Sequence, residues 1–138
     1  MGDLTKWVLL YAATVPVFFA IDLLWLGLIA RDFYRAQLRS LMADQIVWPV
    51  AILFYLLFIA GLIVFAVAPA LEGGDWTRAL LLGAAFGFFA YATYDLTNLA
   101  TLRDWPATLT VVDIAWGTVL GGTVATASFL IGTRIVDR

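Results

Sequence analysis

Residues 76–101 read WTRALLLGAAFGFFAYATYDLTNLAT, an apolar run that ends in a polar string. The run is as long as the ~20 residues that a helix needs to cross the hydrocarbon core of a bilayer. Its last turns carry an aspartate, an asparagine and two threonines where the helix is still expected to lie in lipid. Such groups are costly in hydrocarbon, so Asp95 and Asn98 are expected to face the interior of a helical bundle and to mark a site.

The composition of the whole chain agrees with a membrane protein. Of its 138 residues, 64% are hydrophobic and 13% are charged, against roughly 45–50% and about 25% in soluble domains. The net charge of -2 and the absence of a basic tract give no basis for a nucleic-acid partner. The chain has no Cys and no His. It therefore lacks a disulfide framework and the commonest general base, and the composition argues against a zinc or non-haem iron site.

Four apolar segments predict an all-α membrane protein built as a single domain over residues 1–138. Strands are not expected, because the segments lack the alternation of a membrane barrel. The first segment is too long for the apolar part of a signal peptide, so we interpret it as a retained span. A proline, Pro69, is expected to close the second segment. The predicted spans are about residues 4–30, 48–68, 77–101 and 107–133.

Two short patterns suggest that the spans form two tandem hairpins of the same kind. Asp22-Leu-x-x-Leu-Gly in the first span resembles Asp95-Leu-x-x-Leu-Ala in the third, and Trp-Pro opens both the second and the fourth span. Such a repeat implies an axis along the membrane normal. Residues 31–47 between the first two spans carry arginines at every fourth position with apolar residues between them, which predicts either a short interfacial amphipathic helix or a charged extension of the first span.

Three aspartates are predicted to lie at one depth in the membrane. Asp22 and Asp95 precede the ends of their spans by about seven or eight residues, and Asp113 follows the start of its span by about seven. At ~1.5 Å per residue, each is expected roughly 10 Å inside the same face. Three carboxylates cannot all stay ionised in a dry site, so at least one is expected to be protonated, unless Arg31 or Arg103 reaches inward to neutralise one.

Neighbouring polar and aromatic residues extend this cluster into a candidate pocket. Residues three or four apart share a face of a helix, which adds an aromatic or amide group beside each acid. An all-oxygen set of this kind suits a proton, a hard cation, or a cationic or hydroxylated small molecule. Glycine pairs four residues apart in the third and fourth spans are expected to let those helices approach closely. The predicted ligand-binding residues are Asp22, Trp25, Tyr91, Tyr94, Asp95, Asn98, Asp113 and Trp116; catalytic residues and cofactors are unknown.

These motifs resemble a known family of sequences. Tyr94-Asp95-Leu-Thr-Asn98-Leu-Ala-Thr101, together with Asp22-Leu-Leu-Trp25 and Asp113-x-x-Trp116-Gly, is similar to the predicted bacterial membrane proteins of the domain of unknown function 2177 family. The resemblance implies a multi-pass protein of the bacterial inner membrane. It implies no activity.

The sequence alone leaves three functions open. The first is a pocket for a small molecule, ion or proton, used for binding or transport. The second is an accessory subunit of a larger membrane complex, for which apolar composition and glycine stripes suffice. The third is a membrane enzyme acting on lipid or isoprenoid substrates, since paired carboxylates can act as acid and base. Expected partners are the lipid bilayer, a small-molecule or cation ligand, and a homo-oligomer or larger complex. The Lys and Arg counts of the two faces tie, so the orientation is not predicted.

Overall fold

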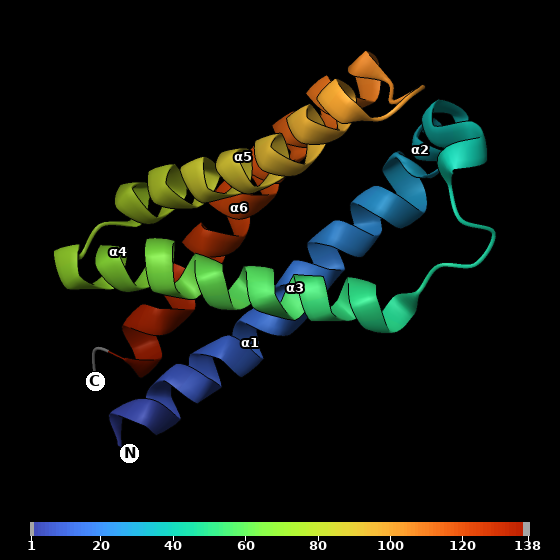
Figure 1. The fold of residues 1–138 in the computed structure, drawn as a ribbon. Helices are drawn as coiled ribbons and strands as arrows, with labels where there is room; N and C mark the ends of the chain where they lie inside the picture. Colours follow the sequence, from blue (N-terminus) through green and yellow to red (C-terminus); the bar gives the residue numbers. More distant parts are fainter. Residues whose placement is uncertain (1, 137–138) are drawn as a thin grey trace.

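The computed structural model describes residues 2–136, and this part of the chain is helical without a strand (Figure 1). Four of its helical stretches are long and apolar enough to cross a membrane. The prediction of an all-α membrane protein with four spans in two tandem hairpins is therefore confirmed. The spans are Asp3–Ile29, Trp48–Gly73, Trp76–Thr101 and Ala107–Ile135.

Each of the first two spans contains a π-helical turn, whereas the last two are uninterrupted α-helices. The first span is α1 (Asp3–Leu24) followed by the π-helix η1 (Trp25–Ile29), and the third and fourth spans are α5 (Trp76–Thr101) and α6 (Ala107–Ile135). The second span consists of α3 (Trp48–Leu62), the π-helix η3 (Ile63–Val67) and α4 (Ala68–Gly73).

The second span does not end at Pro69, contrary to expectation. Pro69 lies in the first turn of α4, and the helix continues to Gly73. A proline inside a helix removes one hydrogen bond and clashes with the carbonyl four residues earlier. That carbonyl belongs to η3, which has already departed from the α-helical hydrogen-bond pattern, so the proline interrupts little. The helix ends instead where Gly74 adopts a left-handed φ of 71°.

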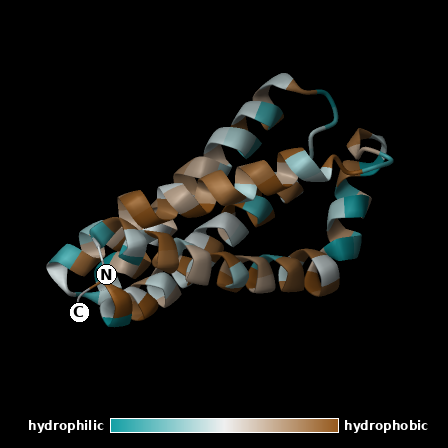
Figure 2. Cartoon of the chain, turned by 90° about the horizontal axis from the view of Figure 1, so that it is seen from below, coloured by the Kyte–Doolittle hydropathy of each residue, from teal (hydrophilic) through white to brown (hydrophobic). Residues whose placement is uncertain are grey.

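The segment after the first span forms a separate short helix rather than an extension of that span. The chain bends at Ala30, and α2 (Arg31–Leu38) follows, with a single 3-10 turn, η2 (Arg39–Leu41), after it. Figure 2 shows α2 turned away from the first span and coloured as more hydrophilic than the spans. One face of α2 is half-buried and contacts η1 and α6, while its arginines point outward. We call the end of the bundle that carries α2 and the α5–α6 turn the α2 end.

The second hairpin is closed by a seam of glycines, as the sequence predicted. A Cβ atom on Gly87 would lie 2.0 Å from the carbonyl oxygen of Gly117, and one on Gly121 would lie 2.2 Å from that of Gly83. These positions therefore bring the backbones of α5 and α6 into direct contact, which no larger residue allows.

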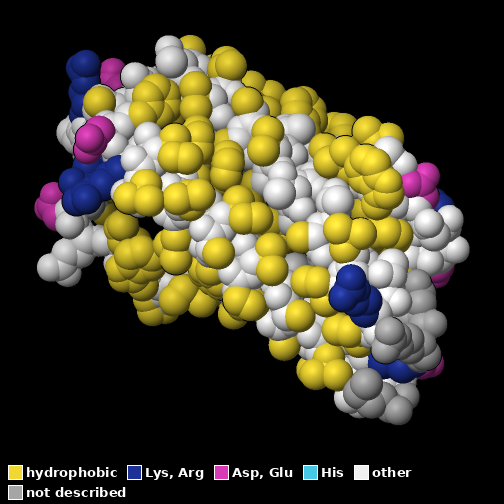
Figure 3. Space-filling view, turned by 180° about the vertical axis from the view of Figure 1, so that it is seen from behind, with side chains coloured by type: hydrophobic (Ala, Val, Ile, Leu, Met, Phe, Trp, Pro, Cys, Tyr) yellow, Lys and Arg dark blue, Asp and Glu magenta, His cyan; other side chains and the backbone are white. Residues whose placement is uncertain are grey.

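The four spans pack around one apolar core, which includes Phe18, Ile59, Val67 and Leu120. α3 leaves this core toward its Trp48 end, and its ribbon diverges from α5 in Figure 1. The second span contacts α5 through η3 and α4. Charged side chains gather toward the two ends of the face drawn in Figure 3, and apolar side chains cover the body between them. That distribution matches a helical bundle surrounded by lipid.

Candidate functional site

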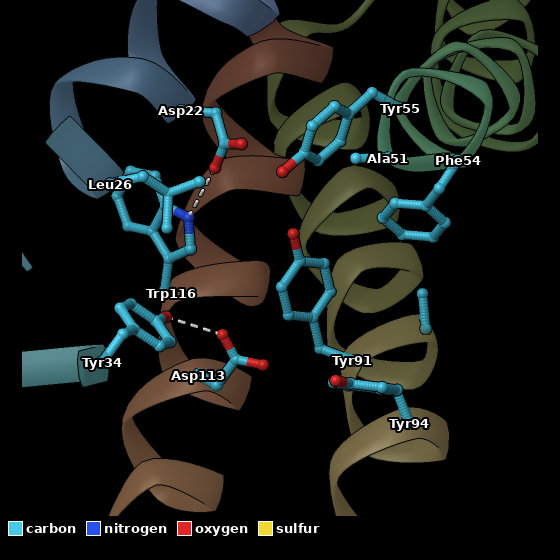
Figure 4. Close-up of a pocket in the computed structure, with 11 residues that line it drawn as sticks. Asp22, Leu26, Tyr34, Ala51, Phe54, Tyr55, Tyr91, Tyr94, Asp113 and Trp116 are labelled. Carbon is cyan, nitrogen blue, oxygen red and sulfur yellow. Dashed lines mark hydrogen bonds between the residues drawn. The ribbon is translucent and has the colours of Figure 1, made fainter. Parts of the chain in front are cut away.

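A cavity of about 310 Å³ lies toward the α2 end, and all four spans and α2 contribute to its walls (Figure 4). It exists because α3 diverges from α5, so the middle of the bundle is not closed by helix packing there. The residues that line it are Asp22, Leu26, Tyr34, Ala51, Phe54, Tyr55, Ala90, Tyr91, Tyr94, Asp113 and Trp116.

Asp22 forms the deeper polar end of the cavity. Its side chain is 3% exposed, and one carboxylate oxygen accepts a hydrogen bond of 3.2 Å from the indole Nε1 of Trp116. In Figure 4 the hydroxyl of Tyr55 points toward this carboxylate, and the hydroxyl of Tyr91 points toward that of Tyr55. Hydrogen bonding thus favours the ionised form of Asp22, whereas its burial opposes ionisation.

Asp113 forms the second polar end of the cavity. It lies on α6, about one helical turn from Trp116. The hydroxyl of Tyr34 donates a 2.7 Å hydrogen bond to its carboxylate. Tyr34 lies on α2, outside the spans, and burial together with the neighbouring Asp113 carboxylate raises the pKa of its phenol. The phenol therefore stays protonated and remains a donor at any physiological pH. This bond ties the short helix α2 to the fourth span.

Two stacked indoles connect the polar ends. The rings of Trp25 and Trp116 lie 4.4 Å apart between centroids, with 6° between their planes. Trp116 donates to Asp22, while Trp25 Nε1 donates a 3.2 Å hydrogen bond to the hydroxyl of Tyr34, which in turn donates to Asp113. Trp116 of the fourth span therefore bonds to Asp22 of the first, and Trp25 of the first span is linked through Tyr34 to Asp113 of the fourth. Neither tryptophan is bonded to the aspartate three residues before it in its own helix.

Asp95 lies behind Asp113 and is the most isolated of the three acids. It is fully buried, and neither of its carboxylate oxygens accepts a hydrogen bond from a conventional donor. The ionisable group with which its carboxyl interacts is that of Asp113 on the neighbouring helix α6. The close approach of α5 and α6 at the glycine seam explains why two acids from different spans meet here.

Five of the eight residues predicted from the sequence line the cavity: Asp22, Tyr91, Tyr94, Asp113 and Trp116. The other three surround it. Trp25 packs behind Trp116, Asp95 lies behind Asp113, and Asn98 is half-buried next to Tyr94, one turn further along α5. Asp95 and Asp113 meet directly, while Asp22 lies beside Trp116, one turn deeper than the common depth that was expected.

Tyr34 and Tyr55 also line the cavity but were not among the residues predicted from the sequence. Tyr55 follows Pro49 by six residues, which is nearly the distance from Pro106 to Asp113, so the depth argument that selected Asp113 also applies to Tyr55. Tyr34 lies on the apolar face of α2, and no pattern in the sequence indicates that α2 folds back over the bundle.

Neither a basic side chain nor a metal-binding cluster accompanies these acids. No Lys or Arg is among the residues that line the cavity, and Arg31 and Arg103 are exposed outside it. Among residues 2–136, no group of three or more His, Cys, Asp or Glu side chains is arranged to hold a metal ion.

The fold and the cavity define a class: a four-span helical membrane protein with carboxylates facing a pocket inside the bundle. The chain belongs to the family of predicted membrane proteins called DUF2177, whose profile matches residues 7–130. The family resemblance noted from the sequence motifs is thereby confirmed. No curated protein and no solved structure shows significant similarity to the chain.

Proposed function

We propose that this protein binds a lipophilic organic cation in the cavity between the spans, as a binding or transport step within the membrane. The single observation that carries the proposal is that Asp22 and Asp113 face one cavity walled by aromatic rings and by no Lys or Arg. Carboxylates inside a bundle are costly unless a positive charge or a proton compensates them. A cationic ligand would supply that charge.

The walls of the cavity suit an organic cation better than a bare ion. Four tyrosines, one phenylalanine and one tryptophan line it: Tyr34, Tyr55, Tyr91, Tyr94, Phe54 and Trp116. The faces of aromatic rings attract ammonium groups electrostatically, and their apolar surface covers attached hydrocarbon. The volume of about 310 Å³ is at the lower end of the range typical of small-molecule sites.

The position of the cavity favours entry from the lipid. Phe54 on α3 and Tyr94 on α5 both line it, and their side chains are 47% and 56% exposed. Both residues belong to spans, so their outer surfaces face lipid rather than water. A molecule with an apolar body is already concentrated in the bilayer and would reach the acids between these two helices.

As predicted from the sequence, we expect the protein to lie in a bacterial inner membrane and to assemble as a homo-oligomer or within a larger complex. A four-span unit is small for alternating access, so transport is expected to involve a second copy of the chain.

The test is a binding measurement on purified protein in lipid nanodiscs, with decyltrimethylammonium and decanol as probes of equal chain length. Isothermal titration, corrected with empty nanodiscs, is expected to show saturable binding of the cation and much weaker binding of the alcohol. Asp22→Asn should weaken binding of the cation by about tenfold or more, because it removes one partner of a buried charge pair. Glu72→Gln, an exposed acid at the opposite end of the bundle, serves as the matched control. Equal affinity for the two probes, or equal affinity of Asp22→Asn and Glu72→Gln, would contradict the proposal.

A further inference from the structure

We infer that Asp95 and Asp113 hold one exchangeable proton between them, and that a cation entering the cavity displaces it. Binding would then be an exchange of an organic cation for a proton. The inference rests on the proposed function and adds to it the identity of the groups that carry the proton.

The geometry of Asp95 requires a proton at this position. Its carboxyl is fully buried, receives no hydrogen bond from an N–H or hydroxyl donor, and has the carboxyl of Asp113 as its neighbouring ionisable group. Two neighbouring carboxylates in a water-poor site cannot both be ionised unless a positive charge lies beside them. A single proton between them resolves the contact, because the protonated carboxyl donates a hydrogen bond to the ionised one.

Asp113 connects this proton to the ligand. Its carboxyl interacts with that of Asp95, and it also lines the cavity. In the free protein the pair carries one proton and one negative charge. When a cation binds beside Asp113, the O–H bond of the protonated carboxyl breaks and the proton passes to water. The pair then carries two negative charges beside one positive charge, so the total charge of the site is conserved.

The other titratable groups around the pair do not replace it in this role. Asp22 lies about one turn away on α1 and is also buried, but unlike Asp95 it accepts a hydrogen bond from Trp116, which favours its ionised form. The phenols that face the cavity ionise near pH 10 in water and are neutral at physiological pH; they are Tyr34 on α2, Tyr55 on α3, and Tyr91 and Tyr94 on α5. No Lys or Arg lines the cavity.

The contrast between the two buried acids supports the assignment. Asp22 and Asp95 occupy matching places in the two hairpins, yet only Asp22 has a hydrogen-bond donor. The ionised form of Asp22 is stabilised by a donor that Asp95 lacks, so Asp95 is the better suited of the two to hold a proton. A site with one acid of each kind can exchange a proton without losing its attraction for a cation.

The experiment measures proton release when decyltrimethylammonium binds to the protein in nanodiscs. A pH-indicator dye in weakly buffered medium is expected to report about one proton released per cation bound, and none on addition of decanol. The affinity for the cation should rise by about tenfold per pH unit over the range in which the free pair keeps its proton. Glu72→Gln should behave as the unaltered protein does, whereas the affinity of Asp95→Asn should no longer depend on pH.

Infrared spectroscopy provides a second reading on the unaltered protein, which decides the matter even if a variant fails to fold. The free protein is expected to show the carbonyl band of a protonated carboxyl, which should disappear when the cation binds and be absent from Asp95→Asn. Binding of the cation without proton release, or a band that survives binding, would overturn the exchange while leaving the binding site standing. Proton release that persists in Asp95→Asn would overturn the assignment to this pair. If neither probe binds, both the exchange and the proposed function fail.

Discussion

The two hairpins of this protein come from similar sequence patterns but are held together in opposite ways. In the second hairpin, α5 and α6 touch backbone to backbone at Gly83, Gly87, Gly117 and Gly121. In the first hairpin, α1 and α3 cross through a group of rings, in which Phe18 lies 5.5 Å from Tyr55 and 5.8 Å from Phe58 between ring centroids. Beyond that crossing α3 diverges, as Figure 1 shows.

This difference explains where the cavity lies. The glycine seam makes α5 and α6 one continuous wall and brings Asp95 and Asp113 into contact. The bulky crossing in the first hairpin keeps α3 at a distance and leaves space in front of that wall. A bundle made of two glycine-seamed hairpins would place the same acids together without room for a ligand.

The largest expected effect comes from breaking the glycine seam. Gly87→Ala places a methyl group 2.0 Å from the Gly117 carbonyl oxygen, so the two helices must move apart. We expect a loss of about 1–3 kcal/mol in the free energy of unfolding, in spite of the better helix propensity of alanine. Unfolding in mixed micelles, followed by helical circular dichroism, measures it. Gly27→Ala is the control, because no atom lies within 4 Å of the added methyl group. Equal stability of the two variants would show that the seam is not what closes the second hairpin.

A smaller, local effect is expected where α2 meets the second hairpin. Tyr34→Phe removes the hydroxyl that donates to Asp113 and accepts from Trp25. A hydrogen bond typically contributes about 0.5–1.5 kcal/mol, so the amides of α2 should exchange with solvent up to about tenfold faster. The amides in the middle of α5 and α6 should keep their exchange rates. If α2 keeps its protection, packing of its apolar face rather than the Tyr34 hydroxyl holds it in place.

The two hairpins are joined across α1 and α6 by a buried pair of hydroxyls. Thr14 Oγ1 lies 2.8 Å from the backbone carbonyl oxygen of Leu10 and 2.8 Å from Ser128 Oγ. Thr14 has one hydroxyl proton, so when it donates that proton to Leu10, Ser128 donates to Thr14. Thr14→Val removes this acceptor and should cost about 1 kcal/mol, as is typical of hydrogen bonds between membrane helices. The double variant Thr14→Val/Ser128→Ala should recover part of the loss, since it leaves no buried hydroxyl without its partner. A double variant less stable than Thr14→Val would contradict this reading of the pair.

The sequence predicted the features that depend on composition and on depth. Apolar segments of membrane length and glycine pairs four residues apart each have one physical meaning in a bilayer, and the structure contains both. Counting residues from the ends of the spans also predicted that Asp113 and Asp95 lie at the same depth in the membrane. These inferences need only the rise of a helix and the cost of polar groups in lipid.

What the sequence did not predict depends on how helices are rotated and tilted against each other. The exchange of partners between Trp25 and Trp116 requires knowing which sides of α1 and α6 meet. Tyr55 reaches the cavity because α3 is tilted away from α5, and Tyr34 because the chain bends at Ala30. The continuation of the second span beyond Pro69 depends on η3, and a π-helical turn has no sequence pattern of its own. The depth of Asp22 differs by one turn from that expected, and η1 lies between Asp22 and the end from which its depth was counted.

The smallest expected effect concerns the turn that links the first hairpin to the second. Asp75 caps α5: its carboxylate accepts a 2.8 Å hydrogen bond from the Thr77 amide and a second one from the Thr77 hydroxyl. These bonds lower the pKa of Asp75. A carboxyl whose pKa is lowered by folding stabilises the folded state above its unfolded pKa of about 3.9, and this contribution is lost as the pH falls through the lower, folded value.

Below about pH 4, the first turn of α5 should therefore loosen while the core stays intact, and the amide chemical shift of Thr77 reports it. Asp75→Ala should loosen that turn at every pH. Asp75→Asn should keep most of the cap without the pH dependence, since asparagine is also a good N-cap. If the pairing of the hairpins relies on their packed faces rather than on this turn, neither variant will move the unfolding midpoint as far as Gly87→Ala does. A comparable shift of the midpoint would mean that the turn, and not the packing, holds the two hairpins in register.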